Sequence, residues 1–335
     1  MTKKKKYYLF GFLALLIVIV GYHYIAASRA EQQIDETLQE YDEQEETLSI
    51  KYSSIDITPF SADVSISDLT IIFGDHIERS NQLTFDIGYW DFLNIYFFGA
   101  EYGLNQLDSA FITAVSPSYT NRSARQEIKS DAINISYRGN ALDGLANAIN
   151  GTPFQNKHSL EIESPNITFS LPNTFLTKVK TQQLRYTGSI SDAQTNFWLE
   201  GKHNIQLDSL TWTPPESFQQ KYNFFIKGFG YDSDSIPFDY AQLNTQPGTS
   251  ADILILNANL KSDLALLTAS GSLKIAQPLK DSPIHNVEVS LSDFSDRLKN
   301  VLSNIEQLLD TSLPKKDDQI ILKLKGTISN PSIAQ

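Results

Sequence analysis

From Leu48 onward, apolar and polar residues alternate with a period of two, and this pattern constrains the fold more than any other feature of the chain. The alternation opens with Leu48, Ile50, Tyr52, Val64, Ile66, Leu69 and Ile71, with a shift at Ser67-Asp68. Successive side chains of a strand point to opposite faces of its sheet. The pattern therefore predicts strands that have one apolar and one polar face.

Similar short segments recur at intervals of roughly ten residues, which is typical of an antiparallel sheet built from neighbouring strands. We expect a loop over 229–248, because Pro237 and Pro247 lie in it. Further strands are expected over 83–87, 110–115, 133–137, 160–162, 167–171, 197–199, 205–212, 222–226, 253–260, 264–275, 287–291 and 320–324.

Helical periodicity appears in only a few places, so the predicted fold class is mainly β with a few helices. A short helix over 141–149 should stop at Gly151. An amphipathic helix is expected over 293–310, with Ser292 or Asp293 as its cap. The dense aromatic segment 90–98 fits either a short helix or a strand buried on both faces.

Residues 7–27 form an apolar segment without Asp, Glu, Lys or Arg. Twenty-one helical residues at about 1.5 Å each span the roughly 30 Å core of a bilayer. Lys3 to Lys6 precede the segment, which predicts a cytoplasmic tail over 1–6 and an exported domain after a transmembrane helix. The residues chosen as membrane anchors are Leu9, Phe10, Leu15, Leu16, Ile17, Ile19 and Val20.

A cleaved signal peptide is the alternative for this segment, because Ser28-Arg29-Ala30 loosely fits a cleavage site. Residues 28–47 follow, and eight acids lie between Glu31 and Glu46. We interpret 28–47 as a mostly solvated helical stalk that leads to a β-rich exported domain over 48–335.

Composition and motifs exclude several function classes. The formal net charge of −12 argues against nucleic acid, whose phosphates need Lys and Arg. The absence of cysteine excludes disulfides and thiolate metal sites. The five histidines show no metal-ligand spacing, and a calcium loop at Asp232, Asp234 and Asp239 lacks the glycine and glutamate of an EF-hand. We therefore predict no metal, no cofactor, no catalytic residues and no enzymatic activity.

Three stretches together resemble the AsmA-like superfamily of membrane-anchored, groove-forming proteins. The first is the apolar segment followed by the strand pair over 50–71. The second, 83–117, has a strand, an apolar segment and a strand that ends at Ser116-Pro117. The third is the closing segment 320–333, with Gly326-Thr327 and Asn330-Pro331.

The resemblance implies an elongated, curved antiparallel sheet with an apolar concave face, and a role in moving glycerophospholipids and in outer-envelope integrity. The chain would lie in the inner membrane, with its N-terminus cytoplasmic and its β-rich domain periplasmic. Acyl chains are the expected partner, through Val64, Ile66, Leu69, Ile71, Phe85, Ile87, Trp90 and Phe97.

The residue pattern by itself is also consistent with a lipid-binding sheet, because an apolar sheet face must be covered by another layer or by a ligand. The few expected helices cannot cover about a dozen strands, which at ~4.8 Å each extend near 60 Å. The alternative function is a scaffold or assembly factor that binds a protein partner in the periplasm. A hydrolase with dispersed carboxylates is the third hypothesis.

Overall fold

The structure is a computed structural model that describes residues 3–44, 47–172, 174–250, 252–309, 315–316 and 319–334. Strands account for 49% of the residues and helices for 26%, which confirms a mainly β fold. The helices are α1 (Lys3–Gln44), α2 (Tyr89–Phe98), α3 (Ala100–Gln106), α4 (Ala141–Asn150), α5 (Phe197–Glu200), α6 (Glu216–Gly228) and α7 (Asp296–Leu309).

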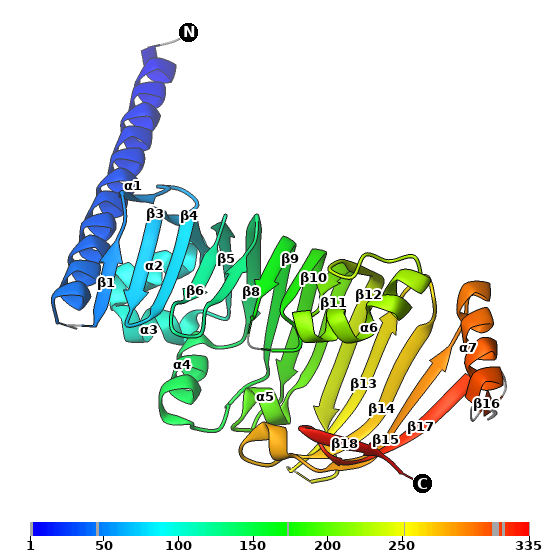
Figure 1. Cartoon of the computed structure of the whole chain (residues 1–335). Coiled ribbons are helices and arrows are strands. Elements are labelled where there is room, and N and C mark those ends of the chain that lie inside the picture. Colours follow the sequence, from blue (N-terminus) through cyan, green and yellow to red (C-terminus); the bar gives the residue numbers. More distant parts are fainter. Residues whose placement is uncertain are drawn as a thin grey trace.

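All strands found in the described residues join one antiparallel sheet (Figure 1). They are β1 (Leu48–Lys51), β2 (Ser54–Ile57), β3 (Val64–Phe73), β4 (His76–Asp86), β5 (Ser109–Val115), β6 (Ser118–Asn121), β7 (Gln126–Lys129), β8 (Ala132–Arg138), β9 (His158–Ser170), β10 (Lys178–Ile190), β11 (Lys202–Thr213), β12 (Ile236–Pro247), β13 (Ile253–Lys261), β14 (Leu266–Lys274), β15 (Ile284–Ser292), β16 (Lys315–Lys316), β17 (Gln319–Thr327) and β18 (Asn330–Ile333).

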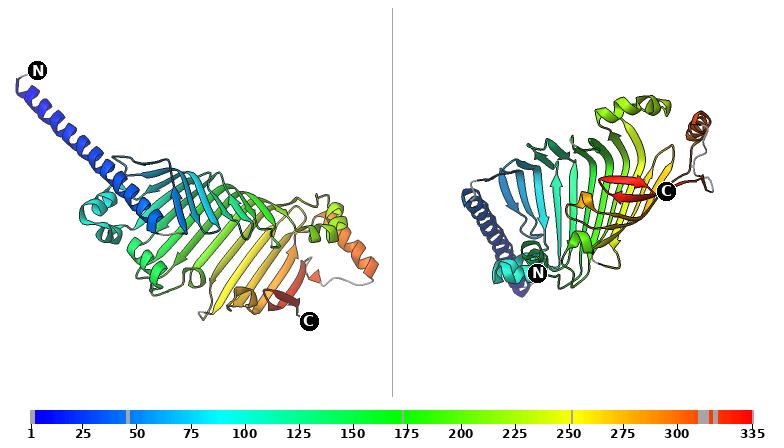
Figure 2. Two further views of the ribbon diagram at one scale, coloured as in Figure 1. Left: turned by 60° about the vertical axis from the view of Figure 1, so that its left-hand side comes forward. Right: turned by 60° about the horizontal axis from the view of Figure 1, so that its bottom comes forward.

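The sheet is a meander in which strands that follow one another along the chain lie side by side. From β8 onward, β9, β10, β11, β12, β13, β14 and β15 pair in sequence order. β17 then pairs with β15, and β18 pairs with β17. Figure 2 shows the result as one long, curved layer that leads away from α1.

The helices sit at the ends of strands. The pair α2 and α3, together with α4 and α5, connects strands at one end of the strands. Helices α6 and α7 connect strands at the opposite end. The right view of Figure 2 shows the first group, coloured cyan to green, at the lower side of the sheet, and α6 and α7 at its upper side. The broad faces of the sheet are therefore left largely without a helical layer.

A crease crosses the sheet from β3 to β12, where β5 with β6 and β7 with β8 are the two halves of one divided strand each. The regular pairing is interrupted at the crease, and the residues there include Asp68, Asn81, Ser116, Asp131, Asn166, Gln182, Ser209 and Asp239. On alternate strands the crease residue has a positive φ of about 50°, as at Asp68 (50°) and Asn166 (50°). Asn and Asp adopt this conformation more readily than most residues.

On the strands that lie between those with a positive φ at the crease, buried hydroxyl groups stabilise the crease. The Thr181 hydroxyl shares its single proton between the carbonyl oxygens of Gln183 at 3.0 Å and Asp208 at 2.6 Å. Ser80 and Ser130 make the same kind of pair, each to the second residue along its own strand and to a neighbouring strand. These bonds satisfy carbonyl groups that the interrupted ladder leaves unpaired.

Helix α1 runs without a break through the segments expected as anchor and stalk. Its second half is not a free stalk, because Ala27 and Ala30 are buried against Ile57, Ala62 and Phe92. No helix is long and apolar enough to cross a bilayer among the residues whose side chains are described. The side chains of Leu9, Phe10, Leu15, Leu16, Ile17 and Ile19 lie outside that part of the chain, and Val20 is half-buried.

Several predicted elements are confirmed. The helix expected over 141–149 is α4, and Gly151 ends it with a φ of 64°. The aromatic segment 90–98 is the helix α2. The helix expected over 293–310 is α7, although Ser295 caps it in place of Ser292 or Asp293, through a 3.3 Å bond from the Leu298 N–H.

Three predicted elements are wrong. Residues 222–226, expected as a strand, belong to α6, in which Phe218, Tyr222 and Ile226 recur every four residues and share one face. Residues 197–199 belong to the short helix α5, which Asn196 caps. The loop expected over 229–248 contains the twelve-residue strand β12.

Candidate functional site

The crease determines which residues face the inside of the curved sheet. Along β9, Leu160 and Ile162 lie on one face, and Ile167 and Phe169 continue on that same face beyond Asn166. The alternation thus shifts by one residue at the crease, so both halves of each strand present apolar side chains to one side. Without this shift, one half of every strand would turn its apolar residues to the other face.

A continuous row of apolar residues crosses the sheet on this face. In register across β3, β4, β5 and β8 lie Ile66, Leu83, Ala114 and Ile133. Two residues further along β8 the row continues through Ile135, Ile162, Tyr186, Ile205, Leu243, Ala258, Ala269, Val289 and Leu322. The row is perpendicular to the strands and extends on the order of 60 Å at about 4.8 Å per strand.

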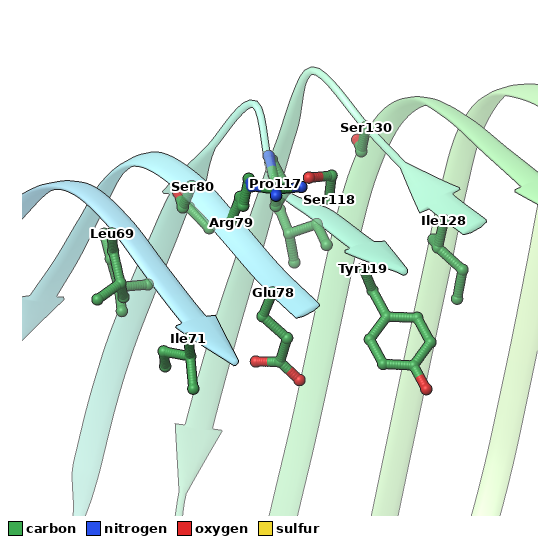
Figure 3. Close-up of a pocket in the computed structure, with 13 residues that line it drawn as sticks. Leu69, Ile71, Glu78, Arg79, Ser80, Pro117, Ser118, Tyr119, Ile128 and Ser130 are labelled. Atoms are coloured by element: carbon green, nitrogen blue, oxygen red, sulfur yellow. The ribbon is translucent and has the colours of Figure 1, made fainter. Parts of the chain in front are cut away.

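A first hollow of about 250 Å³ lies on this face at the crease. It is lined from both sides of the crease, by Leu69 and Ile71 of β3 and by Leu83 and Ile133 of the other half. Figure 3 shows Leu69, Ile71, Glu78, Tyr119 and Ile128 projecting to the same side from neighbouring strands. The two halves of the sheet therefore bend toward this face, which is the concave one, and we call the trough along it the concave groove.

A second hollow of about 740 Å³ lies in the groove beneath α4 and α5. Sheet residues Phe85 and Leu160 form its floor, and Leu145, Ala148 and Trp198 of the helices form its wall. A third hollow of about 300 Å³ lies under α6, and its lining includes Phe218, Tyr222, Ile226, Ile236, Phe238 and Leu264. The groove is thus widened at three points, and apolar side chains dominate each of them.

A buried polar cluster fixes α4 to the rim of the second hollow. The His158 ring is 1% exposed, and its Nε2 lies 2.7 Å from the Asp143 carboxylate. That carboxylate also accepts the backbone N–H groups of Gln155 and Asn156. The other ring nitrogen bonds the Tyr137 hydroxyl, and burial raises the pKa of Tyr137 to about 12. A tyrosine that holds its proton so firmly is suited to anchoring and unsuited to nucleophilic attack.

A second His–Tyr pair secures α5 in a similar manner. The Tyr186 hydroxyl lies 2.8 Å from His203 Nδ1, and His203 Nε2 donates to the Phe197 carbonyl at 2.9 Å. Burial raises the pKa of Tyr186 to about 12 and lowers the pKa of His203. Both histidines thereby serve to position helices at the groove rim.

Helix α1 closes the first end of the groove and covers the sheet edge. β1 and β2 pair only with β3 among the described strands, so their outer N–H groups need other partners. The Glu31 carboxylate accepts the Ile57 N–H at 2.8 Å, and the Asp42 carboxylate accepts the Ile50 N–H at 2.6 Å. Acids that the sequence indicated as solvated stalk residues are therefore edge-capping groups, which are known to protect an exposed strand.

The predicted lipid-contacting residues fall into three groups. Leu69, Ile71 and Phe85 line hollows of the groove, and Ile66 lies in its apolar row. Val64 and Ile87 pack against the cluster formed with α1. Trp90 and Phe97 lie on α2, away from the groove, and are exposed.

Comparisons with protein-family models, with curated proteins and with solved structures find no match. The candidate site therefore rests on geometry alone.

No group of three metal-ligating side chains occurs in the part of the chain that the structure describes. Asp239, weighed as a calcium ligand with Asp232 and Asp234, lies within β12 at the crease, whereas the other two precede that strand. The hollows of the groove offer mainly apolar surface with a few polar side chains, among them Glu78, Arg79 and Asn147, which suits a largely apolar ligand.

Proposed function

We propose that the chain is a membrane-anchored envelope protein that binds phospholipid acyl chains in the concave groove and moves lipid along it. The protein lies in the inner membrane, with residues 7–27 as its anchor, a cytoplasmic N-terminus and a periplasmic β-rich domain. It contributes to outer-envelope biogenesis or integrity, in keeping with the resemblance to the AsmA-like superfamily.

One observation carries this proposal: the concave face is apolar across the sheet, while the helices lie at the strand ends. An apolar face of this size is stable in water only when something covers it. Each buried methylene contributes about 0.8 kcal/mol, so acyl chains of ordinary length gain a large transfer free energy in such a trough.

Site-specific photo-crosslinking in the full chain tests the proposal. A benzophenone amino acid replaces Ile162 on the concave face or Glu163 beside it on the convex face of β9. The protein is reconstituted in vesicles of phosphatidylethanolamine and phosphatidylglycerol, irradiated and analysed by mass spectrometry.

We expect a phospholipid mass adduct at position 162 and none at position 163. Equal labelling at both positions, or no lipid adduct at position 162, would contradict the proposal. A protein adduct at position 162 would instead favour the scaffold function.

A further inference from the structure

The helices α2 and α3 expose an unusual number of aromatic side chains beside α1. Trp90 is 75% exposed, Phe98 is 66% exposed, and Phe97 and Tyr102 are each at least half exposed. The inner side of α2 is also apolar, since Phe92 is buried against Ala27 and Ala30. Apart from Asp91 and Asn94, α2 is therefore apolar, and a largely apolar helix is typical of a protein interior or a membrane.

These aromatic residues form one connected surface with α1. The Tyr22 ring stacks on Phe97 with ring centroids 6.2 Å apart, Phe97 contacts Phe98, and Phe98 contacts Tyr102 at 5.1 Å. Trp90 joins this surface through Tyr89, whose ring contacts His23 next to Tyr22. We call Tyr22, Trp90, Phe97, Phe98 and Tyr102 the aromatic shelf. Figure 1 and Figure 2 both place α2 and α3 beside the helix that carries Tyr22.

The two short helices are held as a rigid pair. A side chain at Gly103 of α3 would place its Cβ 2.2 Å from Ile95 of α2, so only glycine allows this close approach. Gly99, with a φ of 90°, makes the turn between the helices. The shelf is therefore a fixed platform, and its orientation relative to α1 is set by the buried contacts of Phe92.

The position of the shelf along α1 indicates what covers it. Tyr22 lies near the C-terminal end of the apolar segment 7–27, where the proposed transmembrane helix leaves the hydrocarbon core. Trp and Tyr concentrate at this depth, because their rings are apolar and their N–H and O–H groups reach water. Burial, together with the charge of Asp108, raises the pKa of Asp91.

We propose that the aromatic shelf inserts into the interfacial layer of the same membrane that holds α1, and so fixes the first end of the groove at the bilayer surface. This inference rests on the anchor assigned under the proposed function. The net charge of −12 disfavours attraction to anionic headgroups, so insertion depends on the aromatic rings. Zwitterionic lipid is sufficient for it.

The absence of cysteine makes spin labelling a direct test. Single-cysteine variants Trp90→Cys and Phe98→Cys of the full chain are labelled and reconstituted in phosphatidylcholine vesicles. Phe224→Cys is the matched control, because Phe224 is an aromatic residue on α6 that is 84% exposed. Ile17→Cys reports on the anchor.

We expect the labels at 90, 98 and 17 to be several-fold more accessible to oxygen than to a water-soluble nickel complex, and the label at 224 to show the reverse. Labels at 90 and 98 that behave like the label at 224, while 17 is embedded, would overturn the shelf and leave the anchor intact. Labels at 90 and 98 that are shielded from both oxygen and the nickel complex would contradict membrane insertion of the aromatic shelf and would indicate a protein contact instead.

A nickel-accessible label at 17 would remove the anchor and the shelf together. Lipid crosslinking at Ile162 is measured independently, so a failed shelf and a failed groove give different results.

Discussion

At the scale of single residues, we expect the buried hydroxyl groups at the crease to contribute to the free energy of unfolding. Thr181 is 3% exposed and its hydroxyl donates to two carbonyl oxygens of different strands. A buried group with two such partners is costly to remove, because the acceptors stay buried without donors.

The variant Thr181→Val keeps the shape of the side chain and removes the hydroxyl. We expect it to lower the free energy of unfolding by about 1–3 kcal/mol, measured by urea denaturation. Thr187→Val at an exposed position of the same strand, β10, is the control, and its effect should stay within about 0.5 kcal/mol. Equal effects of the two variants would show that the crease hydroxyl contributes nothing special.

The raised pKa of Tyr137 and Tyr186 predicts that the free energy of unfolding decreases in alkali. Their folded-state pKa of about 12 lies above the unfolded value near 10, so the folded state binds the proton more tightly. This contribution to stability is complete below pH 10 and is lost as the pH rises toward 12.

NMR titration of tyrosine labelled with carbon-13 at Cζ should show two resonances that titrate near pH 12, each absent in its Phe variant. Titration of all tyrosines near pH 10 would contradict this assignment.

At the scale of elements, α1 protects the edge of the sheet. Replacing both Glu31 and Asp42 with Ala removes the acceptors of the Ile57 and Ile50 N–H groups. We expect hydrogen exchange at these two amides to accelerate at least tenfold, and the protein to self-associate more readily, because an unpaired edge pairs with other chains.

The control for this variant is Glu43→Ala, an exposed acid on the same helix. It removes the same kind of charge without touching the edge. Unchanged exchange in the double variant would indicate that packing of Ala27 and Ala30 protects the edge by itself.

The comparison of sequence with structure is also clearest at this scale. β3 and α4 were predicted because their periodicity is local and ends at plain signals, such as Gly151. β12 was missed because its apolar residues change phase at the crease: Ile236 and Phe238 precede Asp239, and Ala241 and Leu243 follow it. A strict period of two fails over such a strand, as it does over β3, but β12 also contains Pro237 and Pro247, which indicated a loop.

The candidate site was predictable only in part. Ile66, Leu69, Ile71 and Phe85 were found because strand alternation places them on one face. The wall formed by α4 and α5 was not, because the contact of His158 with Asp143 links residues on different elements. Nothing in the spacing of the acids after Glu31 distinguished edge caps from solvated charges.

At the scale of the whole molecule, the proposed movement of lipid requires a groove that is continuous. The three hollows lie along it, and the third, under α6, is farthest from α1. A charge placed in the middle of the groove should therefore separate its two ends, because a carboxylate buried among acyl chains costs several kcal/mol.

The double variant Ile162→Glu and Ile205→Glu tests this continuity in full chain carrying a benzophenone amino acid at Phe238. With lipid supplied only from the membrane that holds α1, we expect lipid crosslinking at 238 to fall at least fivefold. The control places the same charges on the convex face, by Thr187→Glu and Gln206→Glu. Undiminished crosslinking at 238 in the first variant would show that lipid reaches the third hollow by another route.

The meander also has a consequence for biogenesis. Because nearly every strand pairs with the one made just before it, each new hairpin finds its template already in place as the polypeptide emerges. Such nearest-neighbour pairing keeps contact order low and avoids waiting for distant segments. The sheet can thus form strand by strand from its N-terminal end, so that only the strand added last is open to aggregation at any moment.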